Sequence, residues 1–207
     1  MKKKTFQTKV MPIFTLTVLL TFLSSFIGLQ YVEILSNIFI FILMVIASLI
    51  VLIFLKRQRN NILLLLLFNF LEGLILVPLI YMANLTDPKI IPEAFGVTTL
   101  TFIIFFSIGW FVKKDLSSLG GILLALLILT LVLTFLQRFI TSTFFNLAID
   151  AGIAVLFMVM VVYDINMILN SYSDKDYISA VVSLYLDFFN IFVRIVLILI
   201  RLRRKRL

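Results

Sequence analysis

The stretch Leu35–Leu55, LSNIFIFILMVIASLIVLIFL, contains 21 consecutive residues without a charged side chain. A helix of this length is about 30 Å long, which matches the hydrocarbon core of a bilayer. The basic segment Lys56-Arg57-Gln58-Arg59-Asn60 follows at once. Basic residues of this kind are typical of the cytoplasmic end of a membrane span. Leu35–Leu55 therefore predicts a transmembrane helix.

Six further stretches share this length and apolar character. Backbone groups in hydrocarbon must be hydrogen-bonded within the chain, and segments this long and continuously apolar satisfy that only as helices. The sequence thus predicts an all-α polytopic membrane protein, a seven-transmembrane-helix bundle in one domain, 1–207. We expect a basic tail over 1–10, helices over about 11–200 and a basic tail over 201–207. The other six stretches are Met11–Gln30, Asn61–Met82, Pro92–Val112, Leu119–Leu136, Phe144–Leu169 and Tyr177–Ile200.

The composition excludes several classes of protein. Hydrophobic residues make up 63% of the chain and charged residues 14%, whereas an average soluble domain has about 45–50% and about 25%. The absence of Cys and His excludes disulfides, iron–sulfur clusters and the commonest metal ligands. We therefore expect no bound cofactor, and carboxylates as the source of any pH response.

The positive charges indicate the orientation in the membrane. Before the C-terminal tail, ten Lys and Arg residues fall on the N-terminal side of the predicted spans and two on the other. This bias predicts a cytoplasmic N-terminus in the cell membrane, and it explains the net charge of +8 without a nucleic-acid partner. The five basic residues of the tail oppose this topology, because seven spans place them outside. The alternative is a re-entrant last segment and six spans, but we favour seven.

Five charged residues lie inside the apolar stretches, away from their ends. Each charge at bilayer depth costs at least about 2.5–3.5 kcal/mol, so these side chains should face the interior of the bundle. Asp150 is expected near the outer interface as an ordinary interfacial charge. The five residues are Glu72, Asp150, Asp164, Asp187 and Arg194.

The last stretch has the clearest pattern. Its polar residues follow spacings of 4, 4, 3 and 4, which place them on one face of a helix. Such a stripe predicts that the last helix is central and lines a polar cavity, with hydrogen-bonded glue between helices as the alternative. Arg194 could pair with Asp187 or reach outward to the interface. The stripe consists of Ser179, Ser183, Asp187, Asn190 and Arg194.

Asp164 and Asp187 belong to helices joined by the short loop 170–176, so they can face each other. Two carboxyl groups held this close share a proton and titrate as a coupled pair. Calcium takes only oxygen ligands, and these carboxylates with Asn190 and Ser183 can supply them transiently. Glu72 lies at a similar depth and is a further candidate for an ion path or latch.

Several segments resemble known motifs of one family, and the similarity runs over most of the chain from the third span onward. They are Gly73-Leu74-Ile75-Leu76-Val77-Pro78, Glu93-Ala94-Phe95-Gly96 with Thr98, Lys113-Lys114-Asp115-Leu116, Tyr163-Asp164-Ile165-Asn166 and Ser183-Leu184-Tyr185-Leu186-Asp187-Phe188-Phe189-Asn190. In these segments the chain resembles the Bax inhibitor family, or transmembrane BAX inhibitor motif proteins, as a short bacterial-type member.

The resemblance implies a seven-helix bundle with a central last helix and a proton-sensitive calcium leak across the membrane. It also implies that a pair of aspartates, here Asp164 and Asp187, acts as pH sensor and gate. Where relatives carry a basic partner near the second helix, this chain offers Lys56, Arg57 and Arg59.

Two other functions remain open from the sequence. An intramembrane aspartyl protease would also use two aspartates on adjacent helices. Those enzymes have Gly-x-Gly-Asp where this chain has Leu184-Tyr185-Leu186-Asp187, and no Pro-Ala-Leu element is present. We therefore expect no enzymatic activity. The other alternative is a non-conducting membrane scaffold, which would not need four intramembrane acids.

Overall fold

The structure is a computed structural model that describes residues 1–58 and 61–204. Over these residues it is helical without strands, and it confirms the prediction of seven helices long and apolar enough to cross a membrane. The first span, Lys3–Leu35, joins α1 (Lys3–Thr5), a π-helical turn (Phe6–Val10), α2 (Met11–Gly28), a 3-10 turn (Leu29–Tyr31) and α3 (Val32–Leu35). The others are α4 (Ile38–Arg57), α5 (Ile62–Thr86), α6 (Ile90–Phe111), a 3-10 turn (Ser117–Leu119) with α7 (Gly120–Leu136), α8 (Thr143–Asn170) and α9 (Tyr177–Arg204).

Helix starts follow local chemistry. The side chain of Asn37 accepts a hydrogen bond from the backbone N–H of Phe39 at 3.0 Å, and Ser142 likewise caps α8. Asn and Ser are favoured at this position because a side-chain oxygen satisfies an N–H that has no partner within the helix. Pro12 stands early in α2, where its fixed φ fits the helix.

The chain divides into two compact units. The first comprises Met1–Leu85 with Tyr172–Tyr185, and the second comprises Thr86–Ser171 with the chain from Leu186 onward. Helix α9 therefore contributes its first nine residues to the first unit and the remainder to the second.

In the first unit, α2 and α5 approach closely at Gly73. A Cβ atom at this position would lie 1.8 Å from the Oγ of Ser24 and 2.3 Å from the backbone oxygen of Thr21. A separate apolar cluster joins α3, α4 and α5 through Leu35, Met44 and Val77. Small and hydroxyl side chains thus allow α2 and α5 to approach closely at Gly73, whereas apolar side chains pack α3 and α4 against α5.

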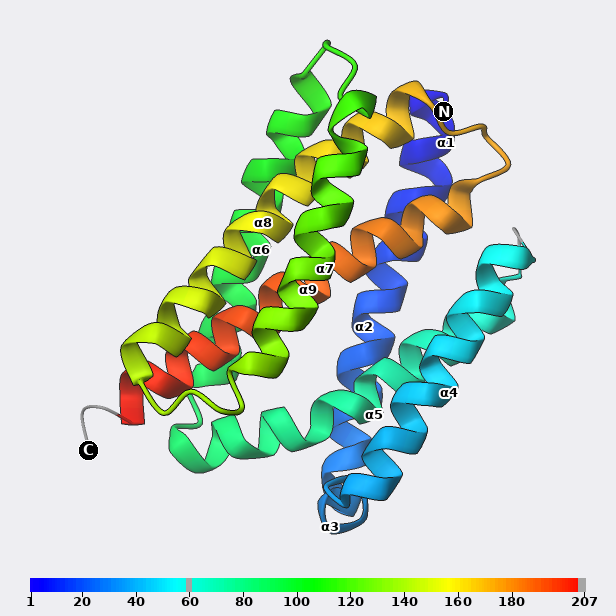
Figure 1. Cartoon of the computed structure of the whole chain (residues 1–207). Coiled ribbons are helices and arrows are strands. Elements are labelled where there is room, and N and C mark those ends of the chain that lie inside the picture. Colours follow the sequence, from blue (N-terminus) through cyan, green and yellow to red (C-terminus); the bar gives the residue numbers. More distant parts are fainter. Residues whose placement is uncertain (59–60, 205–207) are drawn as a thin grey trace. The chain divides into compact units, whose positions relative to one another are not determined.

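In the second unit, α6 packs along α8, and α7 also contacts α8 (Figure 1). The contact with α6 is close at Gly109, where a Cβ atom would lie 2.9 Å from the Cβ of Ile165. Asn166 on α8 fixes the loop that follows α6. Its Oδ1 accepts from the N–H of Leu116 at 3.1 Å, and its Nδ2 donates to the backbone oxygens of Val112 and Lys114 at 3.1 and 3.0 Å.

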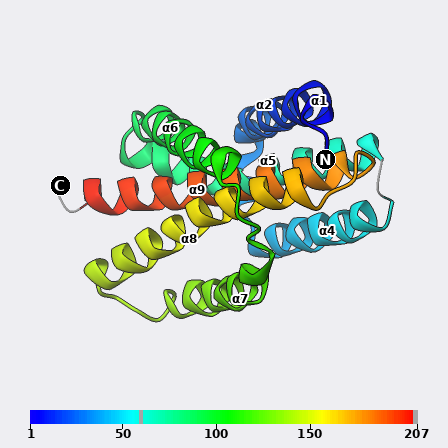
Figure 2. The same cartoon turned by 90° about the horizontal axis from the view of Figure 1, so that it is seen from above.

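Helix α9 is one unbroken helix of 28 residues, drawn in orange to red in Figures 1 and 2. At 1.5 Å per residue it is about 42 Å long, enough to cross a bilayer once. The alternative of a re-entrant last segment is therefore wrong. Helix α9 is also the most buried span, with 61% of its most apolar stretch buried against 11–44% in the others.

Two contacts, one within each unit, agree with the count of seven spans. The backbone N–H of Lys2 donates to the Oδ1 of Asp174 at 2.7 Å, so the N-terminus and the α8–α9 loop lie at one end of the first unit. In the second unit Arg203 forms ion pairs with Asp87 and Glu93, which stand at the start of α6. Three spans precede that position and seven precede the tail, so both should emerge on the same side. These acids offset basic charge that the tail would otherwise carry across the membrane.

We expect a reporter fused after Arg204 to be active only outside the cytoplasm. Fusions of alkaline phosphatase and of green fluorescent protein at this position measure the side, and the same reporters inserted after Asp174 provide the cytoplasmic control. A C-terminal fusion that is fluorescent and lacks phosphatase activity would contradict the seven-span topology.

Candidate functional site

The second unit brings together the two aspartates that the sequence singles out. Asp164 lies on α8 and Asp187 on α9, and their side chains are hydrogen-bonded to each other. Asp187 is only 2% exposed, and Asp164 is half-buried. Ionised carboxylates can only accept hydrogen bonds, so this contact requires a proton on one of the two groups.

The surroundings of this pair are apolar. Phe188, next to Asp187, packs edge-to-face against Phe95 and Phe102 of α6, with ring centroids 6.2 and 5.5 Å apart. Within the described part of the chain, the buried Oδ2 of Asp187 has no hydrogen-bond partner. A carboxylate with a buried and unsatisfied oxygen is costly, so this group is prepared to take a proton or a cation.

Asn190 and Ser183 flank Asp187 along α9. The Nδ2 of Asn190 donates to the backbone oxygen of Leu186 at 2.7 Å, which directs this amide along its own helix. Ser183 is half-buried, lies one turn before Asp187 and belongs to the first unit.

A second cluster of charges lies toward the C-terminal part of α9. Asp150 of α8 is completely buried and accepts from the Nη1 of Arg194 at 2.9 Å and from the Nε of Arg201 at 2.8 Å. The Nε2 of Gln137 donates to the same carboxylate at 3.1 Å, and the Nη2 of Arg194 donates to the Oγ1 of Thr134 at 2.6 Å. We call these five residues the Asp150 cluster.

The Asp150 cluster corrects two expectations from the sequence. Asp150 was expected to be an ordinary interfacial charge, but it is fully buried and bound to two arginines. Arg194 was expected to pair with Asp187 or to reach outward, and the structure pairs it with Asp150. One available signal was the spacing of seven residues between Arg194 and Arg201, which places both on one helix face.

Glu72 lies in the first unit, and its carboxylate accepts a hydrogen bond from the hydroxyl of Ser48. Tyr185, which is fully buried, lies within electrostatic range of Glu72 and is hydrogen-bonded through its hydroxyl to Thr21 at 2.9 Å. The hydroxyl of Thr21 also donates to the backbone oxygen of Asn69 at 3.2 Å. Glu72 is thus part of a polar group that connects α2, α4, α5 and the start of α9.

Comparison with known proteins identifies the family. The family model described as "Inhibitor of apoptosis-promoting Bax1" matches residues 3–204, which is nearly the whole chain. The chain belongs to the Bax inhibitor family. The Tyr163–Asn166 and Ser183–Asn190 motifs, whose resemblance to this family is thereby confirmed, carry both aspartates of the pair.

Individual Bax inhibitor relatives match over part of their length. Bax inhibitor 1 of Schizosaccharomyces pombe is 34% identical over 134 residues, which is 64% of this chain and 49% of that protein. An uncharacterized membrane protein of Vibrio cholerae is 32% identical over 134 residues, 64% of this chain and 60% of that protein. A Golgi anti-apoptotic protein of vaccinia virus (strain Lister) is 28% identical over 113 residues, 55% and 48% of the two chains. The matched region thus spans less than two thirds of these relatives.

The basic residues considered as partners of the pair lie at the end of α4. Lys56 and Arg57 are exposed there, and Arg59 is outside the described residues. In the described ranges 1–58 and 61–204, no group of three or more His, Cys, Asp or Glu side chains could hold a metal ion.

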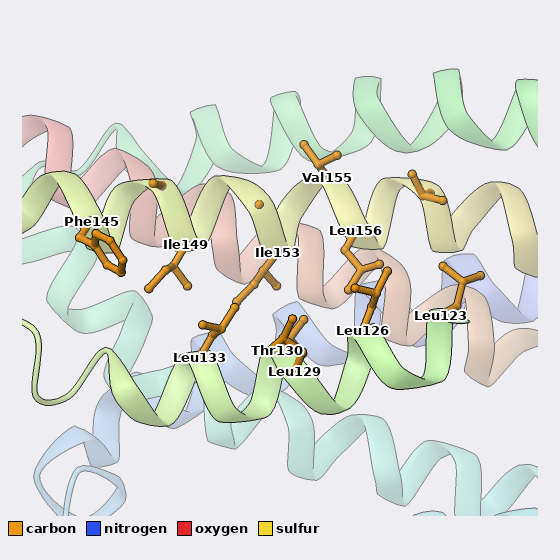
Figure 3. Close-up of a pocket in the computed structure, with 13 residues that line it drawn as sticks. Leu123, Leu126, Leu129, Thr130, Leu133, Phe145, Ile149, Ile153, Val155 and Leu156 are labelled. Carbon is orange, nitrogen blue, oxygen red and sulfur yellow. The ribbon is translucent and has the colours of Figure 1, made fainter. Parts of the chain in front are cut away.

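A groove between α7 and α8 has an apolar lining, unlike the two clusters of charged residues (Figure 3). It encloses about 550 Å³ and is lined by hydrocarbon side chains such as Leu133, Ile149 and Leu156. The hydroxyl of Thr130, which also lines it, donates to the backbone oxygen of Leu127 at 2.7 Å. This lining suits hydrocarbon and gives a hydrated cation nothing to bind, so we exclude the groove as an ion path.

Proposed function

We propose that this member of the Bax inhibitor family is a pH-sensitive leak channel for cations, calcium above all, gated by Asp164 and Asp187. The observation that carries the proposal is the direct hydrogen bond between these two carboxyl groups, one of them fully buried, on two adjacent membrane spans. A structural contact between helices needs no ionisable pair, because Ser or Asn side chains serve that purpose at less cost.

The gating step follows from the proton that the pair holds. With the proton, the hydrogen bond ties α8 to α9 within the second unit. Without it, two carboxylates about 4 Å apart repel by about 4 kcal/mol at an effective dielectric constant near 20. That repulsion separates the side chains and leaves oxygen atoms that suit calcium, which binds only oxygen ligands. We therefore expect the leak to increase as the pH rises.

The proposal also covers the role of Glu72 and the membrane in which the protein resides. In the first unit we propose that Glu72, with Ser48, binds a passing proton or cation. The protein would reside in the cell membrane with a cytoplasmic N-terminus, and lipid would be its principal partner. The proposed function is transport, with calcium and protons as the mobile species, and requires no enzymatic step, cofactor or nucleic acid.

A flux assay tests this function. Purified protein in liposomes that contain a calcium-sensitive dye should release or admit calcium faster than protein-free liposomes, with a rate that rises between about pH 5 and about pH 8. An ionophore added at the end of each trace confirms that the dye responds equally at each pH. A rate that equals that of protein-free liposomes, or one that is flat across this range, would refute the pH-sensitive leak.

A further inference from the structure

The Asp150 cluster contains one positive charge in excess. Arg194 and Arg201 share the single carboxylate of Asp150, and the other two members, Gln137 and Thr134, are neutral. Asp150 has no exposed surface, and Arg194 is only 8% exposed. The extra charge is therefore held inside the protein, where water screens it weakly.

The cluster lies on the same face of α9 as the aspartate pair. Counting from Asp187, Asn190, Arg194 and Arg201 follow at spacings of 3, 4 and 7 residues, which keep one helix face. Arg194 stands about 10 Å and Arg201 about 21 Å along the helix axis from Asp187. A cation that leaves the pair along this face toward the C-terminal end of α9 must pass both arginines.

Arg194 is held firmly in this position. One guanidinium nitrogen binds the carboxylate of Asp150 on α8, and the other binds the hydroxyl of Thr134 on α7. The rigid fork of the guanidinium thus joins two helices, so its charge cannot simply rotate away from a passing ion. Beyond the cluster, Arg203 forms ion pairs with the two acids Asp87 and Glu93, which offset basic charge at the helix end.

We propose that the Asp150 cluster is a second barrier to cations, in series with the aspartate pair, and that its net charge sets the discrimination against divalent ions. This inference rests on the proposed leak function and names the residues that limit it. The electrostatic cost of passing a fixed positive charge is proportional to the charge of the ion. The barrier is therefore twice as high for Ca²⁺ as for K⁺, and removing it should favour Ca²⁺ more.

Charge substitutions provide the test. Arg194→Gln and Arg201→Gln each bring the net charge of the cluster to zero. The double substitution Asp150→Asn with Arg194→Gln keeps the wild-type net charge of one positive charge. Asp150→Asn alone leaves two positive charges. We expect Arg194→Gln to raise the K⁺ leak roughly tenfold and the Ca²⁺ leak roughly a hundredfold, because the barrier scales with ion charge. Arg201→Gln should change both in the same direction. The double variant should resemble the wild type, and Asp150→Asn should leak less.

Arg194→Lys is the matched control for a purely structural role. It preserves the charge and loses the two-helix fork, so it should keep most of the barrier and leak far less than Arg194→Gln. Thermal unfolding of each variant in detergent measures packing separately, and Arg201→Gln keeps the test valid if Asp150→Asn fails to fold, because the side chain of Arg201 is 25% exposed. The leak should stay pH-dependent in the cluster variants that fold, because both aspartates of the pair are intact. Its midpoint should rise in Arg194→Gln, because a nearby positive charge that favours the ionised pair is lost.

The outcomes separate this proposal from the function on which it rests. A pH-dependent wild-type leak that Arg194→Gln and Arg201→Gln do not increase would overturn the barrier and leave the leak function standing. Equal fold-changes for K⁺ and Ca²⁺ would also overturn it, as would an Arg194→Lys variant that leaks like Arg194→Gln. Absence of leak from both the wild type and Arg194→Gln would refute the leak function and the barrier together.

Discussion

Replacing Asp187 with Asn should abolish the pH dependence of the calcium leak and lower its rate. The substitution removes one of the two carboxyl groups whose shared proton, on our proposal, decides whether α8 and α9 stay in contact. Asparagine carries no charge at any pH in the range, so the repulsion that opens the contact is lost. The rate falls as well because Asp187 is the more deeply buried of the two oxygen donors. Calcium flux into liposomes across the same pH range measures both effects.

Asp164→Asn should likewise remove or shift the pH midpoint, with a smaller effect on the rate. Glu33→Gln is the matched control, because it neutralises an exposed acid and should keep the wild-type midpoint. If either aspartate variant keeps the wild-type midpoint, the pair is a structural contact rather than a pH sensor.

Gly73→Ala should destabilise the first unit strongly. The added Cβ atom would lie 1.8 Å from the Oγ of Ser24 and 2.3 Å from the backbone oxygen of Thr21. The hydroxyl of Ser24 can rotate, but the backbone of α2 cannot yield without moving the helix. Overpacking of this kind typically costs about 1–3 kcal/mol and occasionally more, and contact with a backbone atom favours the upper end. Loss of thermal stability and of monodisperse protein in detergent measures the effect.

Gly152→Ala is the control for the effect of the added methyl group itself. Apart from its chain neighbours and the nearby backbone of its own helix, no atom lies within 4 Å of a Cβ atom at Gly152, which is inside α8. Alanine is preferred over glycine in a helix by about 1 kcal/mol, so this variant should be as stable as the wild type or more stable. Equal stability of the two alanine variants would show that α2 and α5 do not pack closely at Gly73.

The number of spans could be predicted from the sequence because a long apolar segment in hydrocarbon must form a helix to hydrogen-bond its own backbone. Each predicted stretch is long enough to cross and has few charges or none. For the stretch Leu35–Leu55, the structure has helix α4 over Ile38–Arg57. The ends were harder to predict. The first helix begins at Lys3 and the last continues to Arg204, since basic side chains at a helix end can extend into the interface.

The partners of Asp150 could not be predicted. Pairing with Arg194 joins residues 44 positions apart, and it depends on how α8 and α9 are rotated about their axes. Helix α8 is apolar on nearly every face, so its periodicity gives little information on that rotation. The contact of Asp164 with Asp187 was easier to predict, because a short loop makes their helices neighbours. Asp187 also belongs to the polar stripe of α9, and Asp164 belongs to the Tyr163–Asn166 motif of α8.

The ion pairs at the end of α9 also constrain the order in which the protein is assembled. Asp150 is synthesised before Arg194 and Arg201, and during that interval its carboxyl group is without the two cations that bind it in the finished fold. A carboxyl group at membrane depth stays neutral until a cation reaches it, or it remains near water. Asp150 can therefore be buried in its ionised form only when α9 has been inserted beside α8. Insertion of α9 thus completes the charge balance of the helix that is synthesised before it.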